Sequence, residues 1–137
     1  DLSGLRLIMI KPNCGVSTKE AYSGIIHHPE VEGQIQQALV EGKSFVEMRP
    51  WLVNDFEQTV FPLHPEIAEI KQRLHDAGAI YTAMSGSGST VFGLFPTPSY
   101  TTLHNTTQHD AEGSTDAQLR LLHEEFAAMV ILDDTLA

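Results

Sequence analysis

The stretch from Met84 to Thr90, which reads Met-Ser-Gly-Ser-Gly-Ser-Thr, constrains the fold more than any other part of the chain. It separates two apolar runs with strand character, Ala79–Ala83 and Val91–Phe95. Its two glycines permit positive φ angles, and their lack of a Cβ atom lets a ligand or another backbone come close. The pattern therefore predicts two strands joined by a tight turn, here called the Gly-Ser loop (residues 85–90).

Two interpretations of the Gly-Ser loop are open at this point. Successive backbone N–H groups can turn inward and form an anion-binding nest, and the hydroxyls add donors, which favours a phosphate-contacting hairpin. The alternative is a plain flexible turn, because Gly and Ser are ordinary turn residues. The loop is not a Walker A sequence, because no lysine follows the second glycine, and it lacks the third glycine of the dinucleotide fingerprint.

The first apolar run, Leu5–Ile10, is almost uninterrupted and predicts a strand inside a sheet, covered on both faces. Helix signals follow it. Ser17 and Glu20 have the spacing of a capping box that starts a helix. Gly33–Lys43 has the pattern of a short amphipathic helix, and Asn54–Glu57 is a second N-cap signature with acids in the first turn.

A clear apolar stripe, Ile67, Ile70 and Leu74, predicts a further helix, with Gly78 just past its end. After the hairpin comes a last helical pattern and then a strand over Ala127–Leu132. The order is strand, helices, strand, strand, helix, strand. It is typical of an α+β fold of the ferredoxin-like, split β-α-β kind, with an antiparallel sheet and helices on one face.

Composition predicts one domain over residues 1–137, in which 96–115 form a long and partly disordered loop. The formal net charge of -10 disfavours nucleic acid and anionic membranes as partners, since the sequence has no basic run. No apolar run approaches the roughly 20 residues that span a bilayer. The single Cys14 excludes an internal disulfide and indicates a reducing, cytoplasmic compartment.

Other residues that attract a chemical interpretation are explained more simply by structure. The adjacent His27 and His28, and the pair His104 and His109, do not have the spacing of a helical metal site, so we expect no metal site. Cys14 is expected to be a small buried filler.

Asp55 and Glu57 also form an apparent acid/base pair, but they fall in the first turn of a helix. Capping and stabilisation of the helix dipole are therefore expected of them.

Three segments together resemble the C-terminal half of the 4-diphosphocytidyl-2-C-methyl-D-erythritol kinases. This family belongs to the galactokinase, homoserine kinase, mevalonate kinase and phosphomevalonate kinase (GHMP) superfamily. The segments are Lys11-Pro12 with Val16–Tyr22, then Asn54–Glu57, then Met84–Gly93, and the resemblance runs from about Leu5 to Phe95.

The resemblance implies an enzyme that phosphorylates a hydroxyl of the cytidyl-linked methylerythritol in the non-mevalonate isoprenoid pathway. ATP and Mg²⁺ are its implied cofactors in the full-length protein, and we expect neither to bind this fragment alone. The implied partners are an N-terminal kinase domain of the same protein and a small-molecule substrate, and a homodimer stays open.

The resemblance also implies roles for single residues. Val16, Ser17 and Thr18 match a segment that lines the methylerythritol side of the cleft. The Gly-Ser loop matches the third motif of the family, which lies against the main phosphate loop. Its candidate residues for phosphate-loop support are Ser85, Gly86, Ser87, Gly88 and Ser89.

Two departures from the family pattern matter. The glycine-rich ATP loop and the catalytic Asp and Lys of the family lie in an N-terminal domain, and no such sequence occurs here. We therefore assign no catalytic residue and expect this chain alone to be inactive. The segment 96–115 also departs from the expected pattern.

The alternative function is a non-catalytic, ferredoxin-like module for ligand binding or regulation, and a structural fragment without a ligand is a third option. A kinase half should have an apolar sheet face opposite its helices, for burial against the N-terminal domain. A free-standing module should have a polar face or a self-dimer there.

Overall fold

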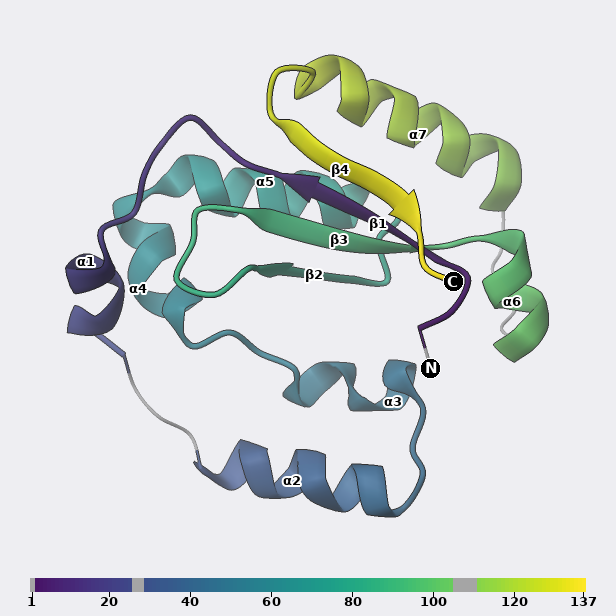
Figure 1. Ribbon diagram of the computed structural model, residues 1–137, viewed down its shortest axis with the longest axis horizontal. Coiled ribbons are helices and arrows are strands. Elements are labelled where there is room, and N and C mark those ends of the chain that lie inside the picture. Colours follow the sequence, from purple (N-terminus) through teal and green to yellow (C-terminus); the bar gives the residue numbers. More distant parts are fainter. Residues whose placement is uncertain (1, 26–28, 105–110) are drawn as a thin grey trace.

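A single four-stranded sheet organises the molecule. The computed structural model describes residues 2–25, 29–104 and 111–137. The strands are β1 (Leu5–Ile10), β2 (Tyr81–Met84), β3 (Val91–Pro96) and β4 (Val130–Thr135), in the spatial order β2-β3-β1-β4 (Figure 1). Every neighbouring pair is antiparallel. This is the predicted α+β, ferredoxin-like arrangement, but the helices are not confined to one face as expected, because Phe45 and Tyr100 from two other helices pack on the opposite face.

The helices connect these strands and cover the sheet. Helices α5 (Pro65–Asp76) and α7 (Ala111–Glu125) pack on one face, and their buried side chains belong to one apolar cluster with those of β1 and β3. In Figure 1, α5 crosses behind the sheet and α7 runs beside β4. The helices are α1 (Thr18–Ser23), α2 (Pro29–Val40), α3 (Phe45–Met48), the 3₁₀ helix η1 (Arg49–Trp51), α4 (Phe56–Leu63), α5 (Pro65–Asp76), α6 (Pro98–His104) and α7 (Ala111–Glu125). In the residues described, no helix combines the length and the apolar character that a membrane span requires.

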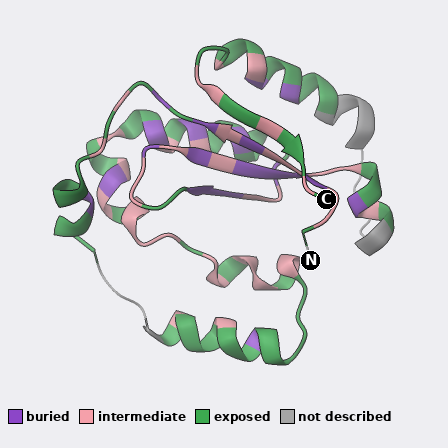
Figure 2. Ribbon diagram, in the orientation of Figure 1, coloured by how far each residue is buried: buried purple, intermediate pink, exposed green. Residues whose placement is uncertain are grey.

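Strand β1 lies inside the sheet, between β3 and β4, as its apolar run predicted. Ile8 and Ile10 face the α5 side and are fully buried, while Leu5 is fully buried in a second cluster with Leu94 and Tyr100. Figure 2 shows this burial concentrated along β1, β3 and α5. Apolar residues are therefore needed on both faces of β1, which explains why they do not alternate with polar ones.

The end of α5 explains why β2 begins later than Ala79, where the sequence placed it. Gly78 has a φ of +104°, and its N–H donates to the His75 carbonyl. The Ala79 N–H donates to the Leu74 carbonyl, so the two bonds form a Schellman motif. Gly78 is thus the predicted residue past the helix end, and Ala79 still belongs to the cap.

The prediction of a long, partly disordered loop over 96–115 is wrong for the residues that the structure describes. Pro98–His104 form α6 and α7 begins at Ala111, while 105–110 lie outside the described residues. The Thr97 hydroxyl accepts from the Tyr100 N–H at 3.3 Å, and Tyr100 is almost fully buried. Thr97 is thus the N-cap of α6, and Pro98 is a proline in its first turn. This is a helix-start signal that a prediction from composition does not detect.

Other boundaries also move. The expected strand Ala127–Leu132 is β4, which starts at Val130 because the N–H groups of Met129 and Val130 both donate to the Phe126 carbonyl at the end of α7. The helix expected over Gly33–Lys43 is α2 and begins at Pro29.

The segment between Ser44 and Pro50, which showed little pattern, forms α3 and enters η1. A capping box of Ser44 with Glu47 starts α3, and it has the same spacing as the confirmed box of Ser17 with Glu20. The signal was therefore present in the sequence, and the short length of α3 hid it.

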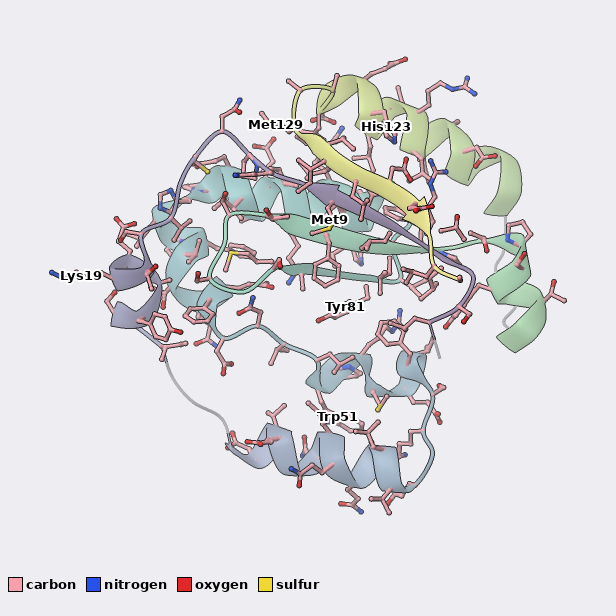
Figure 3. All side chains as sticks on the ribbon, viewed as in Figure 1. Met9, Lys19, Trp51, Tyr81, His123 and Met129 are labelled. Atoms are coloured by element: carbon pink, nitrogen blue, oxygen red, sulfur yellow. The ribbon has the colours of Figure 1, made fainter. Side chains whose placement is uncertain are left out.

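A polar cluster joins the first and last strands to α7. Arg6 donates from Nε and Nη2 to the two carboxylate oxygens of Asp133, at 2.6 and 2.7 Å, and His123 contacts the same carboxylate. The hydrogen bonds from Arg6, with a smaller contribution from His123, hold the pKa of Asp133 below its usual range. Figure 3 shows His123 on the side of α7 that faces β4.

We predict that Asp133→Asn lowers the free energy of unfolding at pH 7 by about 1–3 kcal/mol, because the variant loses charge-assisted hydrogen bonds. Since the folded pKa lies below the unfolded one, the carboxylate stabilises the fold above the unfolded value of about 3.9. This stabilisation disappears as the pH falls through the folded value. Urea denaturation across this pH range measures both effects.

Asp134→Asn is the matched control, since Asp134 is the next residue of β4 and is exposed. It should change the stability by less than about 0.5 kcal/mol. Equal effects of the two substitutions, or a pH-independent effect of Asp133→Asn, would contradict this account.

Candidate functional site

The Gly-Ser loop closes the hairpin between β2 and β3 as a tight turn. The Ser85 N–H donates to the Thr90 carbonyl at 2.7 Å, and the Gly88 N–H donates to the Ser85 carbonyl at 3.1 Å. Gly86 and Gly88 have φ angles of +56° and +99°. Residues with a Cβ rarely adopt such angles, so both glycines are required by the backbone.

The predicted anion nest is only partly available. The Gly88 N–H is used inside the loop and cannot serve a ligand. The amides of Ser87 and Ser89 make no hydrogen bond within the described part of the chain. The amides of Gly86 and Thr90 likewise have no bond among the described residues, whereas Ser89 is buried, so Gly86, Ser87 and Thr90 carry the donors that this loop can offer to a bound anion.

Asn54 ties the Gly-Ser loop to the start of α4. Its Nδ2 donates to the carbonyls of Met84 and Gly86, both at 2.7 Å. Its Oδ1 accepts the Phe56 N–H at 3.0 Å, whereas Asp55, at the N-cap position, makes no side-chain capping bond. One amide side chain therefore caps a helix and fixes the entrance of the loop.

Glu57 holds the strand side of the same junction. Its Oε2 accepts the Met84 N–H at 3.1 Å, and its Oε1 is paired with the ammonium group of Lys71 from α5. Both oxygens of this carboxylate, whose side chain is 12% exposed, are thus engaged. Glu57 fixes the end of β2 and is not a free acid or base, so its role is wider than the expected stabilisation of the helix dipole.

The structure brings the Gly-Ser loop against the segment that follows β1. A Cβ atom on Gly88 would lie 3.2 Å from Val16 Cγ2 and 3.0 Å from Met84 Sδ. These distances are too short for a branched side chain without movement of Val16 or Met84. The absence of a side chain on Gly88 therefore permits the close approach of the two segments.

The other two candidates of this segment have more limited roles. The Ser17 hydroxyl accepts the Glu20 N–H at 3.0 Å, and the Ser17 N–H donates to the Glu20 carboxylate, so both groups serve the helix cap. Thr18 is exposed at the start of α1. Among these residues, Val16 is the one that contacts the loop.

A hollow of about 580 Å³ lies next to Asn54 and Glu57, between the segment 49–58 and strand β2. Its polar lining includes Arg49, Asp55, Glu57 and Lys71. The Tyr81 hydroxyl closes one wall by donating to the Leu52 carbonyl at 2.6 Å. Burial, and to a lesser degree the charge of Glu57, raise the pKa of Tyr81.

Sequence reasoning missed part of this arrangement. It singled out Asn54–Glu57 as a helix start, which is correct, but not as the support of the Gly-Ser loop. The contacts join residues about thirty positions apart, and a capping signature describes only its own helix. The resemblance to the kinase family did group Asn54–Glu57 with the Gly-Ser loop. It was the one indication in the sequence that the two segments belong to the same site.

Comparison with known proteins identifies the domain. Residues 35–101 match the family described as GHMP kinases C terminal. A 4-diphosphocytidyl-2-C-methyl-D-erythritol kinase of Bacteroides thetaiotaomicron is 48% identical over 97 residues, which cover 69% of this chain and 33% of the relative. A relative of the same name from Bacillus subtilis is 45% identical over 92 residues, which cover 64% of this chain and 31% of the relative.

Solved structures agree with this fold. A crystal structure of 4-(cytidine 5'-diphospho)-2C-methyl-D-erythritol kinase superposes with a TM-score of 0.50 at 25% identity, covering 85% of this chain and 39% of the other. A homoserine kinase from Cytophaga hutchinsonii superposes with a TM-score of 0.52 at 18% identity, over 88% of this chain and 39% of its own, and supports the fold alone.

The sheet order and the glycine hairpin define an α+β domain of ferredoxin-like topology. More particularly, the chain belongs to the GHMP kinases and carries their C-terminal domain. It spans about a third of the length of the curated relatives that it matches.

We predict that Asn54→Asp loosens the Gly-Ser loop while keeping the cap of α4. An aspartate still accepts the Phe56 N–H, but it has no donor for the carbonyls of Met84 and Gly86. Amide hydrogen exchange at Ser85 and Gly88, the hydrogen-bonded amides of the loop, should therefore become faster, at a cost in stability of about 1–3 kcal/mol.

Asp55→Asn is the control and should leave exchange in the loop unchanged, because Asp55 makes no capping bond. Unaltered loop exchange in Asn54→Asp would show that the Asn54 contacts do not hold the loop.

Proposed function

We propose that the chain is the substrate-cleft domain of a kinase that transfers the γ-phosphoryl group of ATP to a hydroxyl of 4-diphosphocytidyl-2-C-methyl-D-erythritol. The reaction belongs to non-mevalonate isoprenoid biosynthesis. The placement of Gly88 against Val16 carries this proposal, because it joins the expected phosphate-side loop to the expected substrate-side segment. The relatives named for this activity, at 41 to 48% identity, support the choice of substrate.

The sheet face opposite α5 supports a role beside a second domain. The strand registers place Ala83, Phe92, Met9 and Leu132 in one row across the sheet on this face. Phe92 and Met9 are half-buried, and Leu132 is 40% exposed. An apolar row of this kind is what a kinase half needs for contact with an N-terminal domain, the partner that we propose for it.

ATP and Mg²⁺ are assigned to that partner domain and not to this chain. Mg²⁺ prefers carboxylate and phosphate oxygens, but both carboxylate oxygens of Glu57 beside the Gly-Ser loop are already paired. The residues present here do not fit a magnesium site at the loop. The loop contributes N–H donors and close packing, and the catalytic groups lie elsewhere in the proposed enzyme.

The competing function is a ferredoxin-like module that binds a ligand or regulates a partner without chemistry. A polar sheet face would favour it, and the observed row is apolar. The coding sequence upstream of Asp1 separates the two functions, because a glycine-rich phosphate loop there belongs only to the kinase.

We predict that Gly88→Val sharply lowers turnover of the full-length kinase. Valine adds a branched side chain where only 3.0 to 3.2 Å is available, and at a φ of +99° it costs about 1–3 kcal/mol. Ser87→Ala should do less, because it removes one hydroxyl and keeps the backbone N–H. Turnover and thermal melting of both variants measure the difference.

Normal turnover of Gly88→Val would mean that the loop is a plain hairpin turn. A fall in activity that merely follows a fall in melting temperature, in both variants, would assign the loop a structural role only.

We also predict that the 137-residue chain alone does not phosphorylate the cytidyl-methylerythritol substrate with ATP. The positioning and charge stabilisation on which phosphoryl transfer depends require groups that this chain lacks. An assay of labelled phosphate transfer checks this, with a full-length kinase as positive control. Transfer by the chain alone would require a different catalytic map.

A further inference from the structure

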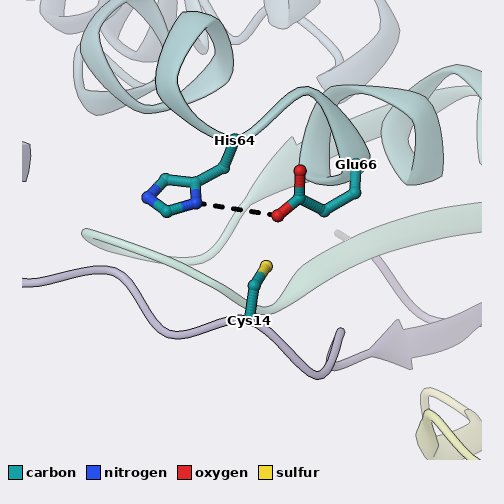
Figure 4. A group of neighbouring side chains, drawn as sticks. All are labelled: Cys14, His64 and Glu66. Atoms are coloured by element: carbon teal, nitrogen blue, oxygen red, sulfur yellow. Dashed lines mark ion pairs between the residues drawn. The ribbon is translucent and has the colours of Figure 1, made fainter.

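A thiol, an imidazole and a carboxylate converge beside the junction of α4 and α5. They belong to Cys14, His64 and Glu66, and one candidate ligand atom from each lies within 4.8 Å of the others. His64 Nδ1 is 3.6 Å from Glu66 Oε1. Figure 4 shows the Cys14 sulfur pointing toward the space between the other two side chains.

We propose that Cys14, His64 and Glu66 bind a Zn²⁺-class metal ion, through Sγ, Nδ1 and a carboxylate oxygen. The site lies outside the candidate phosphate and substrate residues. It differs from our expectation of no metal site, which was based on the spacing of other histidines. Of these, His27, His28 and His109 lie outside the described residues.

The separations suit an ion with short bonds. A tetrahedral Zn²⁺ binds sulfur at about 2.3 Å and nitrogen or oxygen at about 2.0–2.2 Å. Its ligands are therefore about 3.3–3.8 Å apart, by the geometry of that tetrahedron. The pair His64 and Glu66 already has this spacing at 3.6 Å, so small side-chain rotations complete the set.

The second nitrogen of His64 provides an independent indication. Nε2 is buried and has no hydrogen-bond partner among the described residues, but it lies 3.6 Å from Glu20 Oε2. A histidine that binds a metal through one nitrogen usually donates its other N–H to a carboxylate. Glu20 is held near this position by the capping box, since its carboxylate accepts the Ser17 N–H.

The donor set selects the kind of metal. Thiolate and imidazole favour Zn²⁺ and related transition ions over Mg²⁺ or Ca²⁺, which take oxygen ligands. Three protein ligands leave a fourth position for water. A cleft of about 350 Å³ lined by Cys14, Glu66 and Glu69 gives solvent and ions access to the sulfur.

The metal-free state is consistent with a reversible site. Burial, and then the hydrogen bond to Glu66, raise the pKa of the Cys14 thiol. Binding of an ion through Sγ releases the thiol proton to solvent as the sulfur–metal bond forms. A bound ion would connect the segment after β1 to the start of α5. The connection would be at Cys14, two residues before Val16.

The test uses Co²⁺ as a spectroscopic probe of the longest natural form of the protein that contains residues 1–137. We expect one Co²⁺ ion to bind per chain. The complex should show the visible-region bands of tetrahedral cobalt and a thiolate charge-transfer band, and Zn²⁺ should remove both signals by displacing Co²⁺. Cys14→Ser should abolish the charge-transfer band, and His64→Gln should weaken binding by about tenfold or more. Zn²⁺ should raise the melting temperature of the wild type but not that of Cys14→Ser.

Two further variants sharpen the result. Glu20→Gln keeps the capping box but loses the charge, and it should weaken binding by about 10- to 100-fold. His75→Gln is the control, because His75 lies on the same helix with a side chain that is 71% exposed, and it should bind like the wild type. If Cys14→Ser fails to fold, protection of the wild-type thiol from alkylation by Zn²⁺ replaces it.

The proposal is overturned if no charge-transfer band forms, if the band persists in Cys14→Ser, or if His64→Gln binds as tightly as the wild type. It is also overturned if Zn²⁺ fails to slow alkylation of Cys14. None of these measurements depends on kinase activity, so their failure would leave the proposed function untouched.

Discussion

The pairing of β1 with both β3 and β4 is the interaction on which the other features depend. It joins the two ends of the chain in one sheet, because β1 lies near the N-terminus and β4 near the C-terminus. It also fixes where the chain leaves β1. From that exit the segment 11–16 runs along the hairpin end of the sheet and brings Val16 to Gly88. A shift of register by one residue would turn Ile8 and Ile10 away from α5 and displace this segment.

Polar side chains, and not the apolar core, set the shape of the loop. The core fixes β2 and β3, but the turn between them has two glycines with positive φ and few packed side chains of its own. Asn54 and Glu57 supply what the loop lacks, through bonds to Met84 and Gly86. Because these bonds go to backbone atoms, they hold the chain path and leave the serine side chains free to vary.

The sequence predicted the fold well wherever the signal was local. The apolar run at Leu5–Ile10, the capping box at Ser17 and the helix end at Gly78 each depend on residues close in the chain. The prediction for the segment 96–115 failed because its abundant threonine suggested a loop. In the structure, Thr97 caps a helix in which Tyr100 is buried.

Contacts between distant residues could not be predicted in this way. Asn54 meets the Gly-Ser loop, and Cys14 meets His64 and Glu66, only after the helices have packed on the sheet. No periodicity or motif spacing encodes such a meeting. For the candidate site, the resemblance grouped the correct segments, but the particular atoms that join them required coordinates.

The cationic side chains of the hollow beside the hairpin are already engaged in contacts within the domain. The chain carries a formal net charge of -10, which by itself repels phosphate groups. The cations that line the hollow beside the hairpin are Arg49 and Lys71. Arg49 donates to the carbonyls of Val46 and Ile80, and Lys71 is paired with Glu57, so both are already engaged.

The free amides of the loop can therefore orient a phosphate, but in this hollow the charge of Lys71 is offset by Glu57 and the Arg49 guanidinium is held by two backbone carbonyls. Charge stabilisation dominates phosphoryl transfer, so the kinase that we propose needs cations from outside this hollow. This requirement agrees with the apolar row on the sheet face opposite α5, which α3 and α6 cover only in part, because a second domain seated there could provide the cations next to Gly88. In the function that we propose, one N-terminal domain would account for both features, the shortage of positive charge at the loop and the apolar row.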